Sequence, residues 1–155
     1  MDSLLKRTDR ELILTRELKA PRARVFAAWT DPALAAQWWC PSGCTLLSCE
    51  MDVRPGGKWH RRMRVSDGSV IAKYGVYREV EPPARLVFTY ASDYGNGTVD
   101  PETVVSLTFA DVPGGTRLTL WHTDFQDVAV RDSHIGGWTT ALEALKAFCT
   151  SAITD

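Results

Sequence analysis

The sequence lacks long apolar runs, an excess of charge of either sign, and an apolar leader. No apolar run approaches the roughly 20 residues that a helix needs to cross a bilayer, and the polar start, Met1 to Arg10, lacks the apolar centre of a secretory signal. The 18 Lys and Arg against 19 Asp and Glu argue against a strongly basic nucleic-acid binder and a polybasic membrane-surface protein. We therefore expect a cytoplasmic protein that binds no nucleic acid, inserts in no membrane and keeps its four cysteines reduced.

Motifs for cofactors and metals are also missing. The chain has no GxGxxG, GxxxxGK[ST], HExxH or GxSxG pattern, so a nucleotide-dependent enzyme or a serine hydrolase is not expected. Cys40, Cys44 and Cys49 are spaced more widely than the CxxC pairs of most zinc sites, and Cys149 falls on an apolar helical stripe. We expect neither a metal nor a cofactor.

The chain has enough apolar material for one domain. Its 155 residues, 45% of them hydrophobic, can bury a core without a disulfide or a metal to hold it together. We predict a single domain over residues 11–152, preceded by a flexible segment, residues 1–10.

Hydrophobic periodicity predicts the order of elements. Glu11–Leu18 is typical of a strand, Ala23–Thr30 has helical spacing, and Asp31-Pro32 is typical of the start of a second short helix that runs to about Trp39. The period then changes to two and predicts six strands, namely Thr45–Val53, Lys58–Val65, Ile71–Val80, Arg85–Tyr90, Thr103–Phe109 and Thr116–Thr123. Tight-turn residues separate most of these strands, which favours an antiparallel meander. The longest link, Ala91–Glu102, is predicted to be a mobile surface loop.

Helical period returns near the end of the chain. An apolar stripe predicts a long amphipathic helix through Ile135, Trp138, Leu142, Leu145, Phe148 and Cys149. Gly136-Gly137 inside it indicates a helix that starts later or a close backbone approach. The expected fold is therefore α+β: a curved antiparallel sheet of about seven strands around a long C-terminal helix, with two short helices after strand 1 and a pocket between sheet and helix.

Six segments resemble, in order, the Activator of Hsp90 ATPase homologue (AHSA1-type) domain of the START-like, or SRPBCC, superfamily. They are Val25–Pro32, Gln37–Trp39, Met51–Gly57, Glu81–Thr89, Thr116–Leu120 with His122, and Gly137-Trp138. The resemblance covers about residues 11–150 and implies a helix-grip fold with a cavity between the sheet and the C-terminal helix. Cys40 and Cys44 depart from the pattern, because Gly and an aromatic residue are usual at these two positions.

Alternation along the strands selects candidate site residues. His122 and Arg61 fall on the inner face by period two, whereas the faces of Ile71–Val80 (Tyr74 with Val76, or Tyr77 with Glu79) cannot be told apart. His122 could orient a ligand or act as a general base, or be a hydrogen-bonded core histidine; its partner, and hence any catalytic residue, is unknown. Arg61 could bind a carboxylate or phosphate, or extend its head to solvent. The other expected ligand contacts are apolar: Trp38, Trp39, Trp59, Phe88, Tyr90, Leu107, Leu120, Trp138 and Leu142.

Three functions remain open at this point. We favour a protein that binds a small hydrophobic or aromatic molecule in the cavity. A cavity of roughly 300 Å³ or more, lined by Phe88, Leu107, Leu120, Trp138 and Leu142, would support this function, and a fully packed interior would exclude it. The resemblance implies a second function, interaction with an Hsp90-like chaperone. The third is a cyclase-type or hydrolase-type enzyme that uses the same cavity. The protein would be a monomer, or a homodimer if the Trp38-Trp39 pair is exposed.

Overall fold

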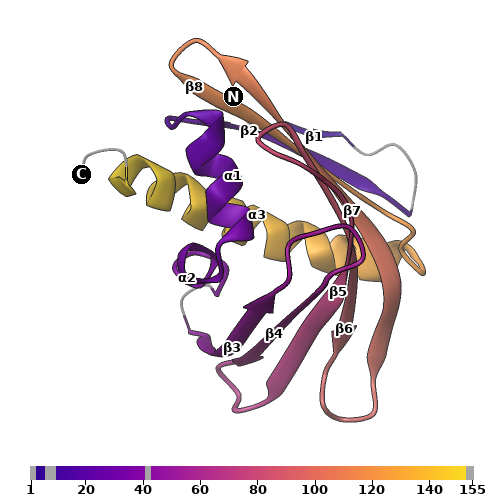
Figure 1. The fold of residues 1–155 in the computed structure, drawn as a ribbon. Helices are drawn as coiled ribbons and strands as arrows, with labels where there is room; N and C mark the ends of the chain where they lie inside the picture. The colour runs from indigo at the N-terminus through magenta and orange to yellow at the C-terminus, as the bar shows by residue number, and fades with distance from the viewer. Residues whose placement is uncertain (1–2, 6–9, 41–42, 153–155) are drawn as a thin grey trace.

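A computed structural model describes residues 3–5, 10–40 and 43–152 and shows a curved sheet that wraps one long helix (Figure 1). The sheet is antiparallel throughout, with strand order β1-β2-β8-β7-β6-β5-β4-β3. Its strands are β1 (Ser3–Leu5), β2 (Leu12–Leu18), β3 (Thr45–Met51), β4 (Lys58–Arg64), β5 (Val70–Glu81), β6 (Arg85–Asp93), β7 (Val99–Val112) and β8 (Gly115–Thr123). The helices are α1 (Arg22–Thr30), α2 (Pro32–Ala35) and α3 (Val128–Ala152). The predicted fold class is confirmed.

The sheet has one strand more than the sequence predicted. The three residues of β1 pair antiparallel with β2, so the two short helices follow the second strand and not the first. Residues 1–2 and 6–9 lie outside the described residues, and the flexibility predicted for residues 1–10 therefore stays a prediction.

The link between β6 and β7 is much shorter than the predicted loop, Ala91–Glu102. β6 continues to Asp93 and β7 begins at Val99, with a tight turn between them in which the Tyr94 amide donates to the Thr98 carbonyl at 3.0 Å. Pro101 lies where the register between the two strands shifts, and a bulge is a place where a strand tolerates a residue without an N–H. The turn-forming residues therefore mark a turn and a bulge in long strands, not a long loop.

The core lies between the concave face of the sheet and α3. Inner residues of β6, β7 and β8 are buried with the apolar stripe of α3, and the largest contributors are Leu86, Phe88, Leu107, Leu118, Leu120, Trp138, Leu142 and Leu145. Each such side chain contributes roughly 1.5–3 kcal/mol when it is fully removed from water. Arg16 of β2, whose side chain is buried, donates from Nε to the Glu143 carboxylate at 3.2 Å and so joins α3 to the sheet.

Helix α3 passes through Gly136 and Gly137 without interruption. Both expectations for this pair are wrong, because the helix begins at Val128 and a Cβ at either glycine would meet no heavy atom within 4 Å. No helix in the described part of the chain combines the length and apolar character needed to cross a membrane.

Cys40 and Cys44 form a disulfide, with Cα atoms 5.8 Å apart. The expectation that all four cysteines stay reduced is therefore wrong for this pair, whereas Cys49 and Cys149 are free thiols. The disulfide spans the connection between α2 and β3, next to Trp39.

Candidate functional site

A cavity of about 160 Å³ lies between α3 and strands β4, β5 and β6. Its lining combines a small-residue face of the helix, an aromatic wall and two basic side chains. The lining residues are Trp39, Arg61, Met63, Lys73, Tyr90, Tyr94, Ser133, His134, Gly137, Trp138 and Ala141.

Three small residues of α3 explain why space remains here. Ser133, Gly137 and Ala141 are spaced by four, so they share one helix face, and this face lines the cavity. Further along α3, Leu142 and Leu145 fill the equivalent space against the sheet and are buried. Ser133 and Gly137 are exposed to solvent, which places the mouth of the cavity at this part of the helix.

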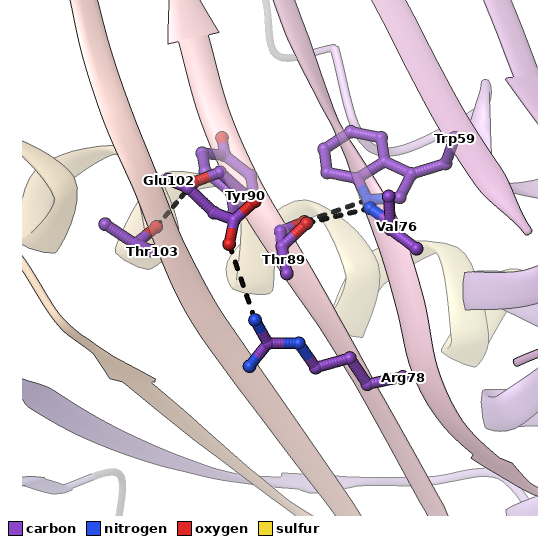
Figure 2. A network of polar contacts seen from close by, with 7 residues as sticks. All are labelled: Trp59, Val76, Arg78, Thr89, Tyr90, Glu102 and Thr103. Atoms are coloured by element: carbon purple, nitrogen blue, oxygen red, sulfur yellow. Dashed lines mark hydrogen bonds and ion pairs between the residues drawn. The ribbon is translucent and has the colours of Figure 1, made fainter. Parts of the chain in front are cut away.

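The aromatic wall is held from behind. Trp39 stacks between Trp38 and Trp59, with ring centroids 5.5 Å away on each side. Trp59 is fixed in turn, because its indole ring lies over Gly75. The indole N–H donates to the Thr89 carbonyl at 3.0 Å (Figure 2). The position of Trp39 in the cavity wall therefore depends on Trp59, which extends across β5 to a backbone carbonyl of β6.

A chain of hydrogen bonds fixes the other aromatic residues. The Trp138 indole donates to Nδ1 of His122 at 2.9 Å, and Nε2 of His122 lies 2.6 Å from the Thr103 hydroxyl. That hydroxyl donates to the Tyr90 carbonyl at 2.6 Å (Figure 2). Because the hydroxyl has one hydrogen, His122 donates from Nε2 and accepts at Nδ1 as a neutral ring. The chain joins α3 to β8, β7 and β6 and orients two cavity residues, Trp138 and Tyr90.

His122 itself is fully buried and is not among the lining residues. Burial, followed by repulsion from His134 and Lys73, holds its pKa well below the ordinary value of 6.5. Both ring nitrogens already have partners, which is the arrangement of the core-histidine alternative. Its predicted contact with a ligand stays a prediction.

We expect the buried neutral His122 to make stability depend on pH. Below about pH 6.5 the unfolded histidine binds a proton that the folded one does not, so the free energy of unfolding falls as pH decreases. Replacing His122 with Gln should reduce the slope between pH 6.5 and 5 by up to about 1.4 kcal/mol per pH unit, the value for one proton. Urea unfolding at several pH values measures this slope. His60→Gln is the control, and an unchanged slope in His122→Gln would contradict the assignment.

Arg61 is the most unusual side chain of the site. It is 3% exposed, and its Nε and Nη1 atoms have no hydrogen-bond partner. Nη2 reaches the Tyr90 hydroxyl at 3.5 Å, and the guanidinium lies 4.0 Å from the centroid of the Trp39 ring. Burial lowers the pKa of Arg61, yet a guanidinium remains protonated at neutral pH. A positive charge is thus held beside the cavity with little compensation.

Lys73 and His134 also line the cavity, and sequence analysis missed both. Lys73 lies opposite Arg61 in the β4–β5 register, and its Nζ donates to the Ser92 hydroxyl at 2.8 Å. His134 donates from Nδ1 to the Val130 carbonyl at 2.8 Å, and burial lowers its pKa. Lys73 shares a face with Gly75 and the buried Tyr77 at intervals of two residues, but the sequence did not show which face of this strand points inward.

Four of the predicted contact residues line the cavity: Arg61, Trp39, Tyr90 and Trp138. The others lie in the packed interior behind it, namely Trp38, Trp59, Phe88, Leu107, Leu120, Leu142 and His122. The cavity is smaller than the expected 300 Å³, and of the five residues expected to line it only Trp138 does, because the other side chains fill the centre of the fold. Trp38 and Trp39 are 1% and 5% exposed, so the pair offers no exposed patch for a homodimer.

Comparison with known proteins yields one family and many structures. The family model described as "Activator of Hsp90 ATPase homolog 1-like protein" matches residues 19–150. A protein of Rhizobium leguminosarum is 27% identical and superposes with a TM-score of 0.81, each chain being covered to 97%. The AHSA1 protein of Silicibacter pomeroyi is 28% identical over 94% of this chain and 99% of its own, with a TM-score of 0.78. A search of curated proteins found no match.

Proposed function

The chain belongs to the Activator of Hsp90 ATPase homolog 1-like family, and from this premise we propose that it binds a small hydrophobic or aromatic molecule in the cavity between the sheet and α3. The observation that carries the proposal is the cavity of about 160 Å³ with an aromatic wall. A cavity of similar size, about 150 Å³, binds benzene in another protein. The expected ligand therefore has a body close to the size of a single ring.

The wall suits such a body. Trp39, Tyr90 and Trp138 line the cavity with large rings, and their centroids lie 5.7 and 6.4 Å apart for the two pairs that include Trp138. Offset or edge contacts between aromatic rings are worth about 0.5–1.5 kcal/mol beyond the apolar area they bury. Because the rings are held by partners behind the wall, little side-chain freedom is lost when a ligand binds.

Native mass spectrometry of the freshly purified protein tests whether a small molecule accompanies the chain. A mass increment that disappears on denaturation supports the proposal. A panel of single-ring compounds, neutral and charged, followed by quenching of tryptophan fluorescence, then measures affinity. Absence of binding by every member at 10 millimolar (about the weakest affinity of interest) would remove the proposal.

Filling the mouth of the cavity should weaken binding without harm to the fold. Gly137 lines the cavity and a side chain there meets open space, so Gly137→Leu should weaken binding of the tightest panel member by about tenfold or more. Gly136→Leu is the matched control, since it adds the same side chain one residue away, outside the lining. Titration of both variants by fluorescence gives the answer, and equal affinity in the two would place the ligand elsewhere.

The description of the family favours a second candidate, an action on the Hsp90 ATPase. Purified Hsp90 mixed with this chain provides the test, with ATP hydrolysis and co-precipitation as readouts. A rate increase that survives Gly137→Leu would show an action independent of the cavity. No binding and no rate change would remove this candidate.

A further inference from the structure

We propose that the ligand is a small carboxylate, whose anionic group is bound by Arg61 and Lys73 while its apolar body lies against the aromatic wall. This inference rests on the proposed function and adds the chemical class of the ligand. Its basis is a buried cation with unused donors beside the cavity.

Arg61 stands apart from the other buried polar groups. Among the described residues, the buried side-chain nitrogen and oxygen atoms without a partner belong to Trp29 and Arg61 alone, and only Arg61 carries a charge. A buried charge without a partner costs several kcal/mol, so folded proteins normally compensate it with a counter-ion. The contacts that Arg61 does make, with the Trp39 ring and a distant Tyr90 hydroxyl, favour a cation but supply no negative charge.

The charges around the cavity have one sign. Arg61 and Lys73 line it, and none of the lining residues is Asp or Glu. The ammonium of Lys73 lies 5.6 and 5.3 Å from the rings of Tyr90 and Tyr94 and bonds to Ser92, which leaves donors for a ligand. The nearby Asp100 carboxylate accepts a hydrogen bond from the Tyr94 hydroxyl and is not among the lining residues. The lining thus offers an anion two cations and no carboxylate.

A carboxylate fits these donors better than a phosphate does. The planar guanidinium of Arg61 matches the two oxygens of a carboxylate, and the ammonium of Lys73 adds a point charge beside it. A phosphate dianion needs donors to three oxygens, whereas the other polar side chains of the lining are committed or lie at the mouth: Tyr94 donates to Asp100, His134 donates from Nδ1 to Val130, and Ser133 is exposed. The volume of about 160 Å³ leaves room for a ring or a short apolar chain besides the carboxylate.

The test compares phenylacetate with phenylacetamide, which has nearly the same shape and no charge. For the wild-type protein we expect phenylacetate to bind about tenfold or more tightly by calorimetry, because hydrogen bonds to a charged group are the stronger ones. Arg61→Met should reduce this preference to less than threefold, and Lys73→Met should reduce it in part. Arg62→Met is the control: it changes the neighbouring residue of β4, which is exposed, and should retain the wild-type preference.

The outcomes separate the two proposals. Equal affinity of the acid and the amide, with no effect of Arg61→Met, would overturn the carboxylate and leave the proposed function intact. Tighter binding of phenylphosphonate than of phenylacetate would overturn the choice of anion. Binding of neither compound nor of any other panel member would remove the proposed function itself. The acid–amide comparison in the wild-type protein needs no variant and therefore does not depend on whether Arg61→Met folds.

Discussion

Gly75→Ala should destabilise the protein by about 3–5 kcal/mol, a large fraction of the roughly 5–15 kcal/mol that holds a domain folded. The added Cβ would lie 1.8 Å from the Thr89 carbonyl oxygen and 2.6 Å from Nε1 of Trp59. The Thr89 backbone cannot move aside freely, because β6 is paired with β7 on its other edge. The Trp59 indole must therefore leave its position. Its N–H then loses the buried hydrogen bond to Thr89, and the neighbouring side chains must repack.

Urea unfolding of Gly75→Ala beside Gly136→Ala measures this effect. The control makes the same chemical change at an exposed helical site where a Cβ meets nothing, and it should stabilise the protein by about 0.5–1 kcal/mol. The tryptophan emission of Gly75→Ala should also shift, since Trp59 stacks on Trp39 in the wall of the cavity. Stability equal to that of the wild-type protein would show that Trp59 does not occupy the space above Gly75.

Much of the fold was predictable because its determinants are local and repetitive. Alternation in strands such as Thr116–Thr123 and the helical stripe from Ile135 to Cys149 place their apolar residues correctly on the inner face. The position of Asp31 as the N-cap of α2 was equally clear, and its carboxylate accepts the Ala33 amide at 2.9 Å. Periodicity of this kind depends on which face is buried and not on which strand lies beside it.

The site was harder to predict because it depends on register and volume. Arg61 was selected by alternation alone, but its lack of a counter-ion follows from the neighbours that β5 and β6 bring to it, Lys73 and Tyr90. The cavity is lined by Ser133, Gly137 and Ala141 of α3, whereas the Gly136-Gly137 pair, judged from the sequence alone, indicates a later helix start or a close backbone approach. The role of Gly75 as a passage for the Trp59 side chain depends on the pairing of β4 with β5.

Arg61→Met should make the free protein more stable, by about 1–3 kcal/mol. The substitution removes a buried charge with two unpartnered nitrogens and fills the space with an apolar side chain of similar length. Buried ionic groups replaced by apolar residues often leave a protein equally or more stable, whereas an unpartnered buried donor costs about 1–3 kcal/mol. The loss of the contact with Trp39, which lies 4.0 Å from the guanidinium, offsets part of this gain.

Urea unfolding without ligand gives the stability of Arg61→Met, and the exposed Arg62→Met should change it by less than about 0.5 kcal/mol. Addition of phenylacetate should then stabilise the wild-type protein more than it stabilises Arg61→Met, because the gain in free energy of unfolding grows with the affinity for the ligand. A residue that lowers the stability of the free fold and is compensated only by ligand is typical of a binding group. If Arg61→Met instead loses stability, Arg61 serves the packing of Trp39 and Tyr90, and its unused donors would be incidental to that role.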